Sequence, residues 1–195
     1  ANFDKQEEDN LNKAMRDVSS CNLFIDETPA IKVVDIRAKL NKLQSRFGDM
    51  GLVVVDYIGL ITPDVKSKKD GSRSLELGEI SAALKAVARD FKCPLLVLSQ
   101  LNRSVEGRAD KIPQLSDLRE SGSIEQDADV VMFLYRDEYY NKESEEKGIG
   151  ECIIAKQRNG PVGTVKMAWI GAHSKFADLD LVHKGTFNNS EKQAV

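Results

Sequence analysis

Two polar side chains directly follow apolar runs of the kind that form strands. Asp56 comes after Leu52–Val55, and Gln100 comes after Leu95–Ser99. In parallel α/β sheets, ligands bind outside the carboxyl ends of the strands, so both side chains are candidates for one site. An aspartate placed in this way is the Walker B pattern, whose carboxylate helps to hold Mg²⁺ on a nucleotide, and a nearby glutamine can hydrogen-bond a γ-phosphate or a water. An aspartate after a strand is also a common turn former or helix N-cap, and that alternative stays open.

A pair of cations is predicted beside a hairpin turn. Lys156 and Arg158 are two residues apart, and side chains two apart on a strand face the same way. Gln157 then faces the opposite side, and Asn159-Gly160 is a good signal for the turn. Two cations beside a phosphate stabilise the charge that develops in phosphoryl transfer. The alternative is a solvated hairpin end, which is the commoner role of such a pair.

The segment Leu118–Asp129 combines a cation, small residues and acidic residues. Arg119, Gly122 and Ser123 supply a positive charge, a closely approachable backbone amide and a hydroxyl, which suit a phosphate backbone. The acidic residues later in the segment would repel DNA, so only the first part of the segment is a candidate for contact with DNA. The alternative is a loop that leads into a helix capped by Ser121 or Ser123.

A second basic segment follows the strand that is expected at Leu52–Val55. Four cations gather there around a glycine, at Lys66, Lys68, Lys69 and Arg73. The segment has no aromatic residue on which a base could stack. It is therefore either a solvated loop or a possible second DNA loop.

Helical and strand patterns alternate along the chain and would position these side chains. The apolar spacing in Ile36–Phe47 predicts an amphipathic helix, and Gly48 suits the residue just past it. Leu77–Phe91 carries a second such face, and the continuous run Leu52–Val55 is typical of a strand buried on both faces. The other expected elements are a helix at Glu7–Val18 and strands at Leu23–Ile25, Leu95–Leu98, Val130–Tyr135, Glu151–Lys156 and Gly163–Ile170.

This order of elements predicts an α/β fold. Helices that alternate with strands imply right-handed crossovers and a mostly parallel sheet flanked by helices, and the last two strands end it in an antiparallel hairpin. The polar segment Leu101–Asp129 interrupts the alternation. It is too long for an idle connection in a compact domain, so we expect it to be a functional loop.

Composition limits the classes of partner. The chain has 195 residues and a net charge of −3, whereas a protein that coats DNA non-specifically is usually basic, so any contact with nucleic acid must be local. No apolar run approaches the roughly 20 residues of a membrane span, and no membrane partner is expected. The widely spaced Cys21, Cys93 and Cys152 fit a reducing cytoplasm better than a disulfide frame or a zinc site.

Four stretches together resemble the DnaB family of hexameric replicative helicases. They are Gly51–Tyr57, Leu98–Ser104, Ser116–Asp129 and Lys156–Thr164, and the likeness runs from about Leu23 to Phe176. The last two stretches match the family in both their length and their amino-acid sequence, so they are the most specific of the four. The resemblance implies a RecA-like ATPase domain that uses ATP and Mg²⁺ in a ring of six identical subunits. It also implies 5′ to 3′ movement on DNA and work with primase and a helicase loader.

The resemblance gives each candidate side chain a role. Asp56 matches the family's Walker B aspartate, which reaches Mg²⁺ through the nucleotide, and Gln100 matches its γ-phosphate sensor. Lys156 and Arg158 match cations that act on ATP held by the neighbouring subunit. The residues that match a central-channel loop on the single-stranded DNA backbone are Arg119, Glu120 and Gly122.

The sequence also departs from the family. It contains no G-x-x-x-x-G-K-[ST] motif, and the family's catalytic glutamate would lie upstream of Ala1. We therefore expect residues 1–183 to be the C-terminal part of a RecA-like domain, incomplete at its N-terminal side and inactive alone, with 184–195 a disordered tail. Two alternatives remain: a RecA- or RadA-like recombinase ATPase, and a non-catalytic DNA-binding or ring-docking module.

Overall fold

The computed structural model describes residues 4–63 and 73–179, with only the secondary structure described at 119–122. The chain divides into two compact units, Ala1–Ala30 and Ile31–Val195. None of the described helices is both long enough and apolar enough to cross a membrane. The expected tail, 184–195, lies outside the described residues, and the extent of the domain stays a prediction.

The first unit carries helix α1, Lys5–Ser19, which confirms the helix expected at Glu7–Val18. Its start is fixed by a capping box, in which the Glu7 amide donates to Asp4 Oδ1 at 2.8 Å and the Asp4 amide donates to Glu7 Oε2 at 2.9 Å. The strand expected at Leu23–Ile25 is wrong, because the structure assigns no strand there. All three side chains are exposed, so the burial that favours a strand is not gained.

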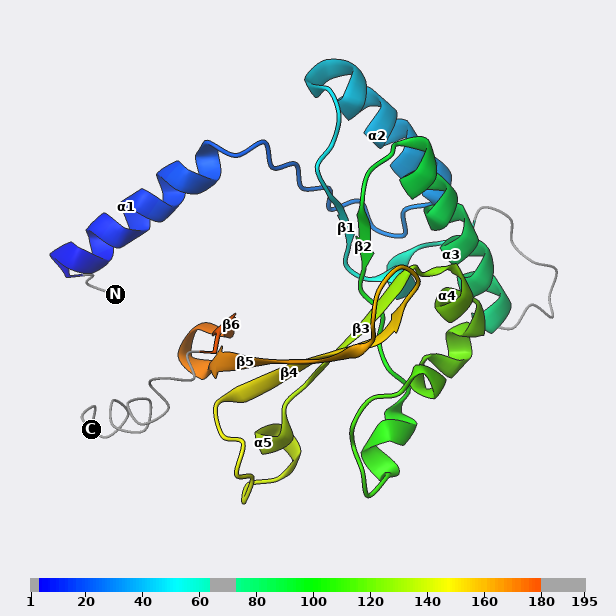
Figure 1. The fold of residues 1–195 in the computed structure, drawn as a ribbon. Helices are drawn as coiled ribbons and strands as arrows, with labels where there is room; N and C mark the ends of the chain where they lie inside the picture. The colour runs from blue at the N-terminus through cyan, green and yellow to red at the C-terminus, as the bar shows by residue number, and fades with distance from the viewer. Residues whose placement is uncertain (1–3, 64–72, 180–195) are drawn as a thin grey trace. The chain divides into compact units, whose positions relative to one another are not determined.

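The second unit contains all the remaining elements (Figure 1). In chain order its helices and 3₁₀ turns are α2 Val33–Phe47, η1 Ile58–Leu60, α3 Arg73–Asp90, η2 Arg103–Gly107, η3 Leu115–Ser121, α4 Gly122–Asp127, α5 Asp137–Tyr140 and η4 Gly171–His173. Its strands are β1 Val53–Val55, β2 Leu95–Val97, β3 Val130–Tyr135, β4 Ile149–Gln157, β5 Gly163–Ile170 and β6 Lys175–Asp178.

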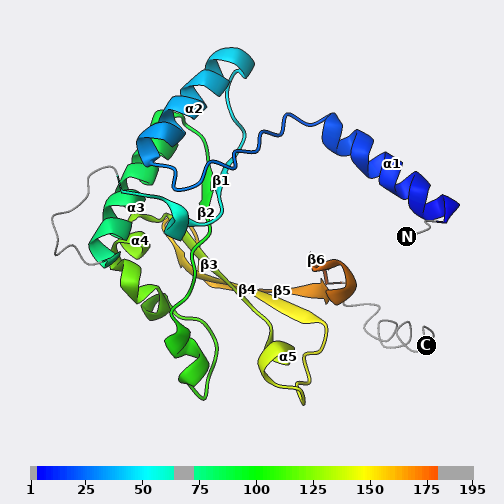
Figure 2. The same cartoon turned by 180° about the vertical axis from the view of Figure 1, so that it is seen from behind.

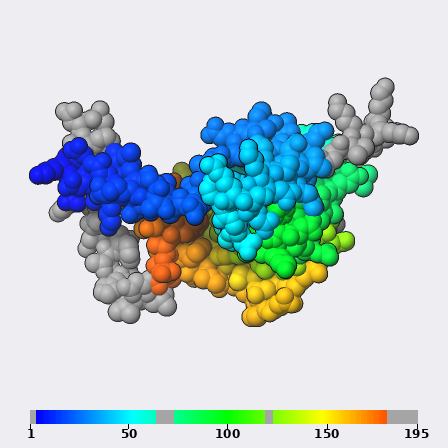
Figure 3. Space-filling view, turned by 90° about the horizontal axis from the view of Figure 1, so that it is seen from above, coloured from blue at the N-terminus to red at the C-terminus, as the bar shows by residue number. Residues whose placement is uncertain are grey.

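Strands β1 and β2 form a parallel pair in which Val53 lies opposite Leu95 and Val55 lies opposite Val97. Helices α2 and α3 lie on the same side of this pair in two opposite views (Figures 1 and 2). The light-blue surface of α2 lies directly against the green surface of the later chain when the molecule is seen from above (Figure 3). This arrangement confirms the predicted helix, strand, helix, strand order and its parallel pairing.

The apolar face of α3 forms most of the main core, as its spacing predicts. Ile80, Leu84 and Val87 are each at most 2% exposed. They pack against Val33 and Leu40 of α2 and against residues next to β1. Each such side chain contributes on the order of 1.5–3 kcal/mol on burial, so this face fixes α3 against the strands.

Strands β3 to β6 form a separate antiparallel sheet in sequence order. The hairpin predicted around Asn159-Gly160 is confirmed, with Ile149 paired to Ala168 and Ile154 paired to Gly163. The short helix α5 and the strand β6 were not expected from the sequence. Among the described strands, only β1 and β2 are parallel, so the sheet expected as mostly parallel is divided into a parallel pair and an antiparallel sheet.

One further expectation needs correction. Strand β1 is not buried on both faces, because Val54 is 54% exposed and only the side chains that face the helices are half-buried. The segment Leu101–Asp129, expected as a functional loop, holds three short helical elements, η2, η3 and α4. That segment keeps its shape because Leu115 and Leu118 pack against Val131 and Phe133 of β3 in a second apolar cluster.

Candidate functional site

Asp56 and Gln100 both lie past the carboxyl ends of the two parallel strands. The Leu98 amide donates to the Val55 carbonyl at 2.9 Å, and the Ile58 amide donates to the Leu98 carbonyl at 3.0 Å. These bonds hold the segments after β1 and β2 together at the point where the two candidate residues leave the sheet. Asp56 is exposed and makes no hydrogen bond or ion pair with any residue that the structure describes. Its carboxylate is therefore available to a ligand at this edge.

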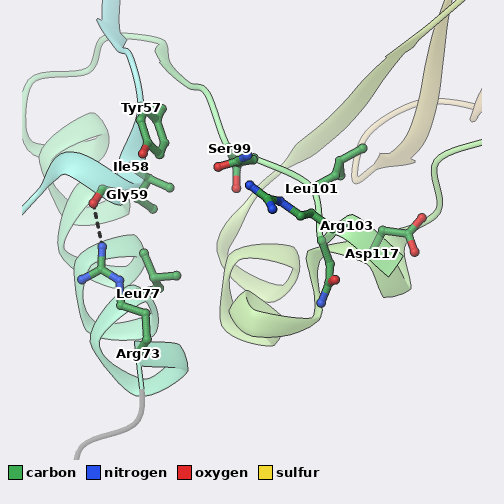
Figure 4. A pocket seen from close by; sticks show the side chains of 11 residues that line it. Tyr57, Ile58, Gly59, Arg73, Leu77, Ser99, Leu101, Arg103 and Asp117 are labelled. Atoms are coloured by element: carbon green, nitrogen blue, oxygen red, sulfur yellow. Dashed lines mark hydrogen bonds between the residues drawn. The ribbon is translucent and has the colours of Figure 1, made fainter. Parts of the chain in front are cut away.

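A hollow of about 480 Å³ opens beside Gln100. Arg73 and Arg103 stand on opposite walls of it (Figure 4). The Arg73 guanidinium donates to the Gly59 carbonyl at 2.7 Å and pairs with Glu76 at 3.0 Å. The hollow thus places the predicted phosphate sensor beside two arginines on opposite walls.

The side chains of Lys156 and Arg158 extend from the end of β4, and both reach the backbone carbonyls at the end of α4. The Lys156 ammonium donates to the carbonyl of Glu125 and lies 3.5 Å from the carbonyl of Gln126. Arg158 Nη2 donates to the same Gln126 carbonyl at 2.6 Å. The two cations therefore share a face, as predicted, and in this structure that face lies against the C-terminal end of α4.

Asp129 lies between these cations and α3. Arg158 Nε is 3.5 Å from Asp129 Oδ1, and Lys85 of α3 forms a salt bridge to the other carboxylate oxygen. The hydrogen bond from Lys85 holds the pKa of the Asp129 carboxyl below its ordinary value, and the charges of Lys85, Arg158 and Lys156 act in the same direction. Asp129 therefore stays ionised and helps to set the direction of Arg158.

The predicted DNA loop lies where η3 meets α4. Arg119 and Glu120 belong to η3, and Gly122 is the first residue of α4. Ser123 packs tightly on α3, because a Cβ added at Gly78 would stand 2.5 Å from Ser123 Oγ. The position of these residues at a helix start suits a phosphate contact, and their assigned role stays a prediction.

The possible second DNA loop is described in one part only. Lys66, Lys68 and Lys69 lie outside the described residues, and Arg73 begins α3. Since the Arg73 guanidinium already holds Gly59 and Glu76, it serves at least partly to fix the start of α3.

Sequence reasoning missed the pair that organises the segment after Gln100. Arg108 holds the carboxylate of Asp117 with two bonds of 2.8 and 3.0 Å, and Asp117 is 4% exposed. The Gln114 amide also donates to this carboxylate at 2.7 Å, and the Asn102 amide donates to the Asp117 carbonyl at 3.1 Å. An aspartate that accepts from the amide three residues before it is a weak sequence signal, and no pattern indicates its partner.

The described residues fit Mg²⁺ as an ion that is brought with a nucleotide. No group of three or more His, Cys, Asp or Glu side chains that could hold a metal occurs in the ranges 4–63 and 73–179. Mg²⁺ is usually held by one or two carboxylates together with phosphates and waters. The free carboxylate of Asp56 is a donor of this kind.

Solved structures define the class of protein. The chain is similar to a solved ATPase domain with a TM-score of 0.85 and 43% identity, over 92% of this chain and 62% of that one. It is also similar to a DnaB-like replicative helicase from a structure described with its interactions with primase, with a TM-score of 0.84 and 43% identity, over 92% of this chain and 42% of that one. The fold is therefore that of a RecA-like helicase ATPase domain.

Sequence comparison gives the family. Residues 1–178 match the DnaB-like helicase C terminal domain, and the chain belongs to this family. It is 55% identical over 170 residues to the replicative DNA helicase DnaB of Geobacillus stearothermophilus, covering 87% of this chain and 37% of that protein. It is 50% identical over 179 residues to the replicative DNA helicase DnaC of Bacillus subtilis, covering 92% of this chain and 39% of that protein. The chain thus spans about two fifths of the length of these relatives, and the match is to the DnaB-like family and not to the recombinase alternative.

Proposed function

We propose that this chain is part of the ATP-driven motor of a hexameric replicative DNA helicase. That motor unwinds duplex DNA in the 5′ to 3′ direction while it holds single-stranded DNA in a central channel. The observation that carries the proposal is the placement of Asp56 and Gln100 past the carboxyl ends of two hydrogen-bonded parallel strands. The names of the two relatives described above, both replicative DNA helicases, support the same function.

Asp56 and Gln100 have separate tasks in this proposal. The exposed Asp56 carboxylate holds Mg²⁺, directly or through a water, and the ion neutralises charge on the phosphates when it is bound. Gln100 hydrogen-bonds the γ-phosphate or the attacking water. Because the chain two residues after Gln100 is tied to Asp117 of η3, a movement of Gln100 can reach the segment that leads to Arg119.

Lys156 and Arg158 act on ATP that is bound to the neighbouring subunit. They lie on the hairpin end of the antiparallel sheet, and they share one face. A guanidinium supplied across a subunit boundary can raise the rate by about 10³ or more, because it stabilises charge in the transition state. This role requires the ring, so activity depends on assembly.

The junction of η3 and α4 contacts the DNA. Arg119, Glu120 and Gly122 meet the sugar-phosphate backbone, which gives binding without base preference. The net charge of −3 suits a local contact of this kind, repeated six times around a ring. We further propose primase and a helicase loader as partners and the cytoplasm as the place of action.

Mixed rings test the trans assignment. Arg158→Ala subunits of a full-length helicase carrying this chain are mixed with subunits that lack the phosphate-loop lysine. ATPase activity should return, because some interfaces then join an intact phosphate loop to an intact Arg158. A mixture of Arg158→Ala and Lys156→Ala subunits is the matched control, and no interface in it is complete.

Two results would count against the proposal. If subunit exchange shows mixed rings and no activity returns, the trans role of Arg158 is wrong. If the unmutated full-length rings bind single-stranded DNA but hydrolyse no ATP, the non-catalytic DNA-binding or ring-docking module is the better description.

A further inference from the structure

Helix α4 is held at both of its ends. At its start, Ser123 packs against Gly78 of α3, and Ile124 packs against the main core. At its end, the carbonyls of Glu125 and Gln126 receive the side chains described above, Lys156 and Arg158. We call these two cations and two carbonyls the α4 clip.

The clip is physically well matched to a short helix. The last four carbonyls of an α-helix have no partner within it, and they form the negative end of the helix dipole. Because α4 has only 6 residues, two cations on two of these carbonyls satisfy a large share of its free acceptors. Arg158 is further directed by Asp129, which is itself paired with Lys85 of α3. The clip therefore joins α4 to the end of the β4–β5 hairpin.

The side-chain nitrogen atoms of Lys156 and Arg158 cannot hold the α4 carbonyls and a phosphate of the next subunit fully at the same time. The Lys156 ammonium and Arg158 Nη2 both donate to α4 here, whereas the proposed trans role needs them on a phosphate of the next subunit. Bonds from a cation to a charged phosphate oxygen are stronger than bonds to a neutral carbonyl. The Arg158 side chain is 51% exposed, so solvent already reaches it and it can leave α4.

We propose that Lys156 and Arg158 are positioning residues for the DNA-contacting segment Arg119–Gly122, because they clip the far end of α4. When ATP is bound at the subunit boundary, they move to its phosphate and the clip opens. Nucleotide bound to the neighbouring subunit thus loosens α4 and changes how tightly the adjoining segment Arg119–Gly122 holds single-stranded DNA. This inference deepens the proposed function and rests on it.

Hydrogen exchange in nucleotide-free, full-length rings tests the clip directly. The reporter is the Ala128 amide, which donates to the Ile124 carbonyl at 2.9 Å at the end of α4. The double variant Lys156→Met/Arg158→Met should exchange this proton about tenfold faster, because α4 loses two charge-assisted bonds. The affinity for single-stranded DNA without nucleotide should change about three- to tenfold in the same variant, since the DNA-contacting segment Arg119–Gly122 leads directly into α4.

Nucleotide dependence separates a clip from a merely structural contact. In the unmutated ring, a non-hydrolysable ATP analogue should raise exchange at Ala128 toward the level of the double variant. The analogue should have no further effect on the double variant itself. Lys156→Arg, which keeps a donor, should preserve the slow exchange. Lys166→Met is the matched control, because Lys166 pairs with Glu146 at 2.9 Å on the same sheet and does not reach α4.

The outcomes distinguish this inference from the function on which it rests. If the double variant exchanges like the control, the clip is overturned. If the analogue leaves Ala128 exchange unchanged in unmutated rings, the opening of the clip by nucleotide is overturned. A ring that loses the trans complementation but keeps the expected exchange behaviour without nucleotide would overturn the trans role of Arg158 and leave the clip as a structural support of α4.

Discussion

Replacing Asp117 by asparagine should destabilise the fold more than any change to a surface ion pair. The Asp117 carboxylate is 4% exposed and accepts two bonds from Arg108 and one from the Gln114 amide. Asparagine keeps the shape but turns an amide toward the guanidinium and leaves a half-buried positive charge unpaired. Breaking a buried pair in this way costs about 3–5 kcal/mol. Because the Arg108 side chain is 30% exposed, water offsets part of that loss, and we expect about 2–3 kcal/mol.

The single tryptophan, Trp169, provides the signal for a urea titration of this chain. The control is Asp90→Asn, which removes the exposed ion pair between Arg37 and Asp90 and should cost less than about 1 kcal/mol. A double-mutant cycle with Arg108→Met should give a coupling energy of about 2 kcal/mol between Arg108 and Asp117. A coupling near zero, or an Asp117→Asn loss no larger than the control, would refute the view that this pair organises the segment after Gln100.

Three further outcomes follow from the sequence and the structure. Phosphate release by this chain alone should match the buffer blank with or without single-stranded DNA, because the sequence has no phosphate-loop motif; DNA-stimulated turnover would contradict this. Gly150→Ala should cost about 1–3 kcal/mol in urea titrations, because the new Cβ would overlap the Phe176 ring, whereas Gly163→Ala meets nothing within 4 Å and is the control. Burial, followed by the hydrogen bond to Asp137, raises the pKa of Tyr135 from 10.0 to about 12. The neutral phenol therefore stabilises the fold fully below pH 10, and this contribution is lost as pH rises to about 12; Tyr135→Phe should flatten that loss in alkaline unfolding curves.

The sequence by itself determined most of the local elements and the family. The periodic apolar face of α3 predicted the buried Ile80 and Leu84, because a helix repeats its faces about every 3.6 residues. The turn signal at Asn159-Gly160 predicted the β4–β5 hairpin, since asparagine and glycine are common in the turns that join antiparallel strands. Motif order was enough to place Asp56 and Gln100 at strand ends. Local chemistry of this kind is encoded in neighbouring residues, so a sequence displays it.

Contacts between distant parts of the chain were decided only by the tertiary structure. The sequence showed Lys156 and Arg158 as a pair but not the α4 carbonyls, about thirty residues away along the chain, that they hold. It did not reveal that Arg108 is the partner of Asp117, because many carboxylates could pair with that cation. Nor did it show that Val54 stays half exposed, since an apolar strand reads the same whether helices cover one face or two. Pairing and burial depend on which surfaces meet when the chain folds, and spacing along a sequence does not specify those encounters.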